Sequence, residues 1–78
     1  MNVEHLVTMA NQIADFFISE AGEAAAPKEI AGHITKFWAP RMRVQYLEHC
    51  AKGGAGLRPA ALAAAGFLAP VAQKAGTA

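Results

Sequence analysis

The sequence predicts an all-α protein, a small bundle of three helices plus a short fourth helix. Over residues 3–18, apolar residues recur at spacings of three and four, which places them on one face of a helix. Pro27, Pro40 and Pro59 each fit the first turn of a further helix, where the missing N–H is harmless. No strand-like alternation of apolar and polar residues is visible, so helices alone are expected.

The first helix is expected over about residues 2–20. Asn2 is suited to cap it, and Gly22 marks its end. Met9 and Phe16 lie on a different side of this helix from its main apolar stripe. That stripe consists of Val3, Leu6, Ala10, Ile13 and Phe17.

The second and third helices are expected over residues 28–38 and 40–51. Ile30, Ile34 and Phe37 share one face of the second helix. Pro40 ends that helix, because the residue before a proline is disfavoured in the helical conformation, and the same proline can begin the third. The third helix stops at Gly53–Gly54, and its apolar side consists of Met42, Tyr46, Leu47 and Cys50.

A short fourth helix is expected over residues 59–67, with Leu62 and Phe67 as its only large apolar side chains. Its alanines favour a helix but offer little surface to bury. From residue 69 onward, the mixture of Ala, Gly and Pro predicts a flexible, weakly ordered tail. The expected organisation is therefore one helical domain over residues 1–68 and a tail over residues 69–78.

Size and composition predict a protein that depends on a partner. A domain of 78 residues buries only about 60% of the surface of its unfolded chain, and such domains usually add disulfides, a metal or a partner. The single cysteine, Cys50, excludes an internal disulfide and fits a reducing compartment. Hydrophobic residues make up 54% of the chain and charged residues only 17%, so exposed apolar surface is expected, and such surface marks interaction sites.

Charge and hydropathy argue against two other classes of partner. The net charge of +1 is too small to attract nucleic acid, and no segment reaches the ~18–20 apolar residues of a membrane-spanning helix. The N-terminus contains Glu4 and His5 and no basic leader, unlike a secretory signal. The cytoplasm is the expected location. A small helical DNA-binding regulator, which would bind duplex DNA in a salt-dependent way, is a less favoured alternative.

Residues suited to metal binding or catalysis are sparse. The three histidines and Cys50 show no metal-ligand spacing, and Cys50 falls near a helix C-terminus, where the helix dipole disfavours a thiolate. The sequence has no serine elbow, phosphate-binding glycine loop or convergent carboxylate pair. We therefore expect no catalytic, cofactor-binding or metal-binding residues in this chain.

The segment of residues 37–43 is the densest candidate for a binding surface, because Trp and Arg are enriched at binding hot spots. Arg41 and Arg43 lie in the first turn of a helix, where the positive end of the helix dipole disfavours cations. We therefore expect an anionic neighbour to compensate for them. That neighbour is either an acidic residue of this chain, with Trp38 capping the core, or a carboxylate or phosphate of a partner. The sequence leaves both open.

Asn11 and Gln12 are likewise either solvated or bonded to a partner's backbone. The residues predicted to contact a partner are Asn11, Gln12, His33, Phe37, Trp38, Arg41, Met42 and Arg43.

Several stretches of the chain resemble one known family. They are Met-Ala-Asn-Gln-Ile at 9–13, Phe-Phe at 16–17, Ile-Ala-Gly-His-Ile at 30–34 and Lys-Phe-Trp-Ala-Pro-Arg-Met-Arg at 36–43, followed by Gln45, His49 and Gly56-Leu57. Over about residues 3–62, the chain resembles the delta subunit of the bacterial NAD-dependent, molybdenum-containing formate dehydrogenases. The sequence departs from the family pattern at Arg58 and in the alanine-rich stretch after Leu62.

The resemblance implies a non-catalytic accessory subunit of a cytoplasmic complex that oxidises formate to carbon dioxide and reduces NAD. The implied partners are the catalytic alpha subunit and, in the same complex, the beta and gamma subunits. That complex is implied to hold molybdopterin guanine dinucleotide, iron–sulfur clusters and FMN, with no redox cofactor on the delta subunit. The implied roles are stabilising the complex and assisting insertion of the molybdenum cofactor. A transient insertion chaperone, absent from the mature enzyme, is an alternative that the sequence leaves open.

Overall fold

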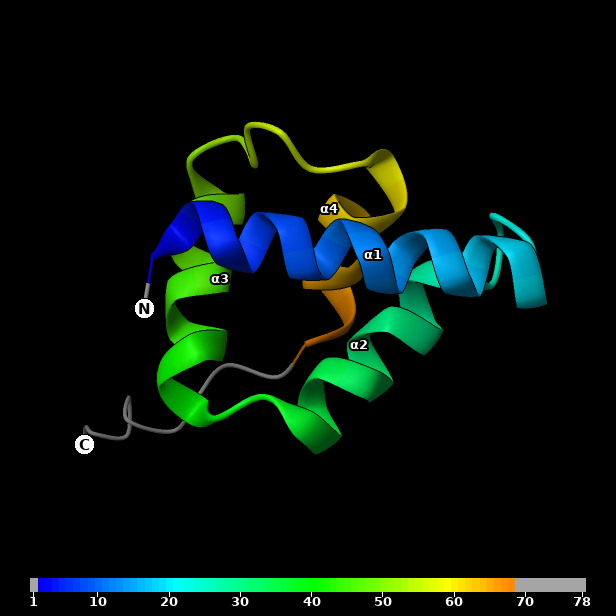
Figure 1. The fold of residues 1–78 in the computed structure, drawn as a ribbon, viewed down its shortest axis with the longest axis horizontal. Coiled ribbons are helices and arrows are strands. Elements are labelled where there is room, and N and C mark those ends of the chain that lie inside the picture. Colours follow the sequence, from blue (N-terminus) through cyan, green and yellow to red (C-terminus); the bar gives the residue numbers. More distant parts are fainter. Residues whose placement is uncertain (1, 69–78) are drawn as a thin grey trace.

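The computed structural model describes residues 2–68, which form four α-helices and a final turn of 3-10 helix (Figure 1). The helices are α1 (Val3–Ala21), α2 (Ala26–Phe37), α3 (Pro40–Ala51) and α4 (Pro59–Ala64), and the 3-10 turn η1 is Ala65–Phe67. This confirms the all-α fold class. The tail predicted over residues 69–78 lies outside the described residues. Among those described, no helix combines the length and apolar content needed to cross a membrane.

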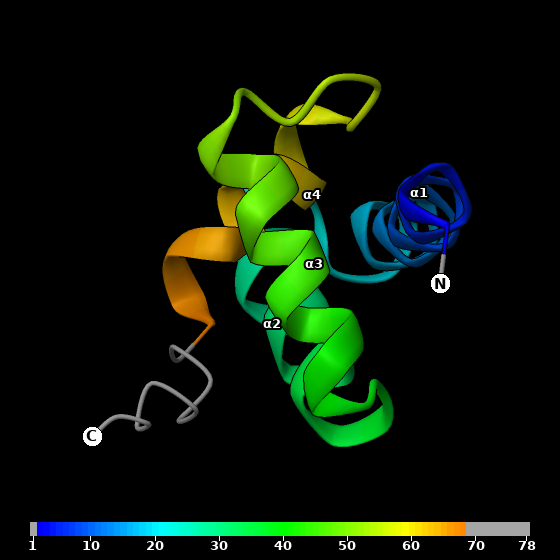
Figure 2. The same cartoon turned by 90° about the vertical axis from the view of Figure 1, so that its left-hand side faces the viewer.

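The longest helix, α1, lies across the others. α1 runs horizontally in Figure 1 and is seen end-on in Figure 2, whereas the axis of α3 is closer to vertical in both views. α2 packs most extensively against α4 and α1. The last turns of α1 extend past α3 and α4 towards the turn that leads into α2 (Figure 1). The buried residues of α1 are Leu6, Ala10 and Ala14, so the helix contributes nothing fully buried after Ala14.

Local sequence features set the helix ends. The Asn2 side chain accepts a hydrogen bond from the backbone N–H of Glu4 at 2.7 Å and so caps α1. Gly22, with a φ of +86°, ends that helix in a conformation that favours glycine. The three later helices have no side-chain cap and instead have a proline in the first turn, as the sequence predicted.

The core is built from few large side chains and many alanines. The largest fully buried side chains are those of Tyr46, Leu6, Ile30 and Ile34, and Trp38 and Leu68 are nearly buried. All other buried apolar residues are alanines, namely Ala10, Ala14, Ala26, Ala31, Ala60, Ala61 and Ala64. Because an alanine adds only a methyl group to the helix surface, helices that meet through alanines pack with their backbones close together. The interior therefore has little room for large side chains.

The fourth helix differs from the prediction. It ends at Ala64 and continues as η1, whereas a single helix was expected over residues 59–67. Although each alanine offers little surface, Ala61 and Ala64 are fully buried. Phe67, expected to be one of its two large apolar contacts, has 59% of its surface exposed. The alanines of α4 make the close contact with α2, and Phe67 lies on the surface beside α2, where it lines a depression with Ala31 and Thr35.

Tyr46 joins α3 to α4 inside the core. Its hydroxyl donates a hydrogen bond to the backbone carbonyl of Ala61, and its ring meets that of Trp38 edge to face at a centroid distance of 5.5 Å. Burial, and then the neighbouring Cys50, raise the pKa of the Tyr46 hydroxyl well above its ordinary value. The folded protein therefore holds this phenol in its neutral form.

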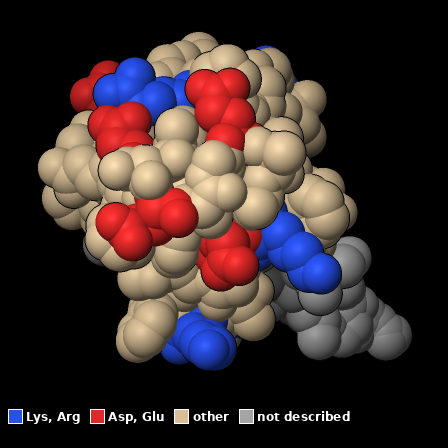
Figure 3. Space-filling view, turned by 90° about the vertical axis from the view of Figure 1, so that its right-hand side faces the viewer, with Lys and Arg blue, Asp and Glu red and all other residues tan. Residues whose placement is uncertain are grey.

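Charge is unevenly distributed along the chain. Five of the six acidic residues lie within residues 1–29, and five of the seven Lys and Arg residues lie within residues 30–68. Acidic side chains gather over the end of the molecule where α1 leads into α2 (Figure 3). Glu20, Glu23 and Glu29 lie in this part of the chain and are all exposed. Lys28 is exposed in the same part of the chain, so the three carboxylates give this end of the bundle a net negative charge.

Replacing Tyr46 by Phe should lower the free energy of unfolding by about 1–3 kcal/mol, because the Ala61 carbonyl then lacks its donor. The pKa of the Tyr46 hydroxyl is higher in the folded protein than its unfolded value of about 10. The native protein should therefore keep this contribution to its stability below about pH 10 and lose it as the pH rises further. Urea unfolding at neutral and alkaline pH, followed by circular dichroism, measures both effects. Equal stability of Tyr46→Phe and the native chain at neutral pH would show that the hydrogen bond to Ala61 does not stabilise the fold. An equally steep loss of stability at alkaline pH in both proteins would show that this loss does not come from Tyr46.

Candidate partner-binding surface

The two arginines at the start of α3 have different surroundings. Arg43 donates from Nη1 to the Trp38 carbonyl at 2.8 Å and, more weakly, to the Thr35 carbonyl at 3.4 Å. Those carbonyls lie at the C-terminal end of α2, which has a partial negative charge. The anionic neighbour of Arg43 is therefore a helix end and not a carboxylate. Arg41 is exposed, and within residues 2–68 it forms no ion pair.

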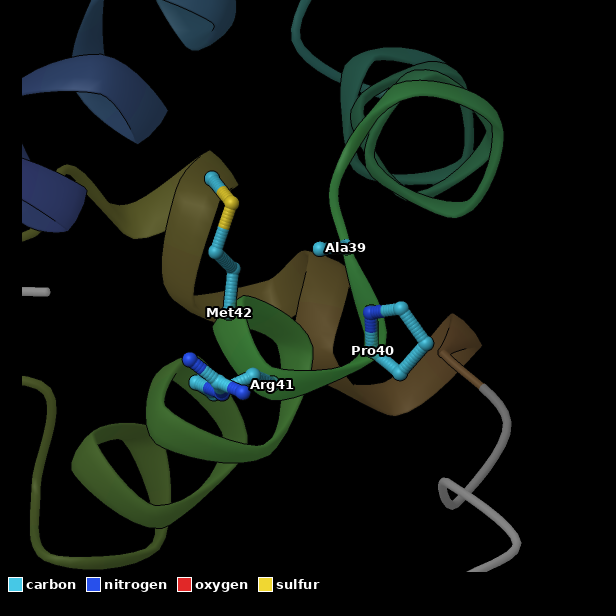
Figure 4. Close-up of a pocket in the computed structure, with 4 residues that line it drawn as sticks. All are labelled: Ala39, Pro40, Arg41 and Met42. Atoms are coloured by element: carbon cyan, nitrogen blue, oxygen red, sulfur yellow. The ribbon is translucent and has the colours of Figure 1, made fainter.

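A shallow hollow lies at the corner between α2 and α3. Figure 4 shows its lining residues, Ala39, Pro40, Arg41 and Met42, with the last two side chains leaving α3 in different directions. Met42 is half-buried and packs against the core. The corner thus presents Arg41 as its charged, exposed group.

Asn11 fastens the loop between α3 and α4 to α1. Its Nδ2 donates to the Gly56 carbonyl at 2.9 Å, and its Oδ1 accepts from the Arg58 backbone N–H at 2.9 Å. Gly56 has a φ of +83°, a conformation that favours glycine. Both ends of the Asn11 amide are therefore occupied by the chain's own backbone.

Two further contacts hold the same loop. The Arg58 guanidinium pairs with Asp15, with Nη2 to Oδ2 at 3.0 Å, and both side chains are about half exposed. An ion pair with that exposure stabilises by about 0–1 kcal/mol. His49 Nε2 lies 2.8 Å from the Ala55 carbonyl and can donate to it. The loop over residues 53–58 is thus tied to α1 and α3 at several points.

A ladder of four aromatic rings crosses from α1 to α2. Phe16 meets Phe17 edge to face at 5.1 Å between ring centroids. Phe17 faces His33 of α2 at 6.2 Å, and His33 lies 4.7 Å from Phe37. The rings are neighbours along one surface, so a partner could contact all four together.

The two ends of this ladder are strongly exposed. Phe16 has 58% of its surface exposed and Phe37 has 70%. Phe17 is half-buried and Phe67 is exposed, so none of the four phenylalanines is buried. Phenylalanine is among the residue types most often found inside proteins. Exposed aromatic side chains that lie together on one surface mark a candidate interaction site.

The floor beside the ladder is a shallow apolar depression between α1 and α2. It is lined by Met9, Gln12, Ile13, Phe16, His33 and Trp38. We call this depression together with the ladder of Phe16, Phe17, His33 and Phe37 the aromatic groove. Met9 and Phe16 were not among the predicted contact residues, although their separate stripe on the first helix is the sequence pattern that could have identified them.

The eight residues predicted from the sequence as partner contacts fall into three groups. Gln12, His33 and Phe37 belong to the aromatic groove and are exposed or half-buried. Arg41 and Met42 lie apart from it, at the corner between α2 and α3. Asn11, Trp38 and Arg43 have roles within the chain, because Asn11 and Arg43 bond to backbone carbonyls and Trp38 is only 4% exposed. Trp38 thus caps the core and also forms part of the groove floor.

Ionisable side chains do not assemble into a metal or nucleophile site in the part of the chain that is described. Within residues 2–68, no three His, Cys, Asp or Glu side chains come close enough to hold a metal ion. Cys50 is a free, half-buried cysteine, and burial raises the pKa of its thiol. The raised pKa favours the unreactive thiol form.

Comparison with known proteins identifies the family. The family model of the NADH-dependent formate dehydrogenase delta subunit, FdsD, matches residues 5–65. The chain belongs to this family. The match confirms the resemblance seen in the sequence, and it includes the whole aromatic groove. Neither the search of curated proteins nor that of solved structures gives a match.

Replacing Asn11 by Ala should destabilise this delta subunit by about 1–3 kcal/mol, because the Gly56 carbonyl and the Arg58 N–H both lose their partner. The matched control is Gln12→Ala, which removes an exposed amide from the adjacent position. Thermal unfolding and hydrogen exchange at the Arg58 amide measure the change. Faster exchange is expected only in Asn11→Ala. The same behaviour in both variants would show that Asn11 does not hold the loop.

Proposed function

We propose that this delta subunit is a non-catalytic accessory subunit of a cytoplasmic, NAD-dependent formate dehydrogenase. It binds the catalytic alpha subunit, stabilises the assembled complex with its beta and gamma subunits, and assists insertion of the molybdenum cofactor. The chain itself binds no redox cofactor. In this proposal the molybdopterin guanine dinucleotide, iron–sulfur clusters and FMN belong to the other subunits.

The observation that most supports binding to a larger subunit is the exposure of the phenylalanines. A free domain of this size needs its large apolar side chains inside, because its core is small. Here Phe16 and Phe37 lie on the surface beside an apolar depression, while alanines line the interior. Family membership supplies the partner, because the family is named as a subunit of formate dehydrogenase.

The state of the ionisable groups supports a non-catalytic role. A catalytic nucleophile or base needs a pKa shifted towards the working pH. The pKa values of Tyr46 and Cys50 are both raised, chiefly by burial, which favours their neutral, unreactive forms. Both groups lie on the core side of α3, where their part is structural.

The proposal is tested by purifying the native complex through an affinity tag on the alpha subunit. Mass spectrometry of the active enzyme then quantifies each component. Stoichiometric recovery of the delta chain is expected. Recovery only with the immature, molybdenum-free alpha subunit would instead favour the transient chaperone. If the delta chain is absent from both forms, and free delta chain does not bind the alpha subunit, the proposed function is wrong.

Cofactor insertion has a separate test. Cells that lack the delta chain should yield alpha subunit with a several-fold lower molybdenum content, measured by inductively coupled plasma mass spectrometry. Re-expression of the delta chain should restore the molybdenum content. An unchanged molybdenum content in the absence of the delta chain would contradict the insertion role and leave the stabilising role as the remaining proposal.

A further inference from the structure

The aromatic groove lies where the bundle gives α1 least cover. All fully buried residues of α1 occur at or before Ala14, and the last turns extend past α3 and α4 (Figure 1). Phe16 and Phe17 lie at the beginning of this last part of the helix. The second side of the groove is the row that contains His33 and Phe37 on α2. Within the described residues, nothing else packs over Phe16 or Phe37, as their exposure indicates.

The groove is bordered by one row of side chains on α1 and one on α2, and each row ends in a carboxylate. On α1, Gln12, Phe16 and Glu20 are spaced by four residues and so share one helix face. On α2, the row of Glu29, His33 and Phe37 has the same spacing. Glu29 also lines a surface depression together with Phe17, His33 and Phe37. Because α1 ends where α2 begins, Glu20 and Glu29 fall at the same end of the groove.

These carboxylates have no cationic partner within residues 2–68, where the ion pair found is that of Arg58 with Asp15. Glu20 and Glu29 are exposed, and they lie near the end of α1 and the start of α2. Lys36, next to Phe37 in the sequence, lines the same depression as Glu29 but forms no ion pair with it. The groove therefore combines an apolar, aromatic middle with a negatively charged end, and its complement is an apolar segment that ends in a cation.

We propose that the aromatic groove binds an apolar segment of another formate dehydrogenase subunit, and that an arginine of this segment pairs with Glu20 and Glu29. The inference rests on the proposed function, which supplies the assembly. Arginine fits best among the cations because its planar guanidinium can bond to a carboxylate and also stack on an aromatic face. Phe16 is one helical turn from Glu20, so both contacts are available at one place.

The two exposed phenylalanines should dominate the affinity. Aromatic side chains contribute a large contact area, and binding energy concentrates in a few such residues near the centre of an interface. The carboxylates should instead set the orientation and the rate of association, because charged groups at a rim act mainly through electrostatic steering. The proposal thus predicts different consequences for the two kinds of substitution.

The test uses the delta chain co-expressed with the other subunits, with the affinity tag on the alpha subunit. The first variant is Phe16→Ala/Phe37→Ala, which changes only exposed side chains. Recovery of this variant with the tagged enzyme should fall by at least about tenfold. Circular dichroism of the isolated variant should match that of the native chain, which excludes unfolding as the cause of the loss.

The second variant is Glu20→Lys/Glu29→Lys, and its control is Glu4→Lys/Glu48→Lys, which reverses two exposed charges elsewhere. Association of the groove variant should be several-fold slower at low salt, with a smaller difference at high salt, and the control should behave like the native chain. If both charge reversals slow association equally, the proposal that an arginine of the partner pairs with Glu20 and Glu29 is wrong.

The outcomes separate this inference from the proposed function. If the native chain itself fails to co-purify, the proposed function is wrong. If the native chain and the Phe16→Ala/Phe37→Ala variant co-purify equally, the delta subunit docks through another surface and the groove proposal is wrong. Self-association of the isolated native chain that Phe16→Ala/Phe37→Ala abolishes would assign the groove to a second copy of this chain and also overturn the proposal.

Discussion

The constraint on which the structure depends is the close approach of helices that meet through alanines. α4 is very short, and it stays in place because Ala61 and Ala64 let its backbone approach the other helices closely. Tyr46 reinforces this contact by bonding from α3 to the Ala61 carbonyl. In the same bundle Phe17 packs against the core from outside, while Phe16, Phe37 and Phe67 are exposed. The bundle thus combines a small core rich in alanine with an aromatic surface, and that surface is suited to burial against a larger subunit.

Polar side chains that resemble binding residues in the sequence instead hold the scaffold together. Arg43 closes the corner between α2 and α3 by binding carbonyls at the end of α2. Asn11 fixes a loop that lies 45 residues further along the chain. Both contacts satisfy backbone groups that lie at helix ends or in the loop between α3 and α4. The surface left for a partner is consequently apolar, with charge at its ends.

The helices and the site were predictable to different degrees. Proline positions and apolar spacing predicted four helices with ends close to those observed, because both features act locally along the chain. The role of Asn11 was not predictable, since it depends on where a distant loop passes over α1. The burial of Ala61 was missed because a methyl group gives no amphipathic pattern. Phe16 had a recognisable pattern, its stripe with Met9, but the sequence alone could not show that nothing in the bundle covers it.

The central claim is that the exposed aromatic surface of the free delta subunit becomes buried in the enzyme. Hydroxyl-radical labelling followed by mass spectrometry measures the solvent access of individual side chains in the free chain and in the purified complex. The account predicts that labelling of Phe16 and Phe37 falls strongly on assembly, while labelling of Tyr46, already buried in the free chain, stays low in both states. Equal labelling of Phe16 and Phe37 in the free chain and in the complex would contradict it.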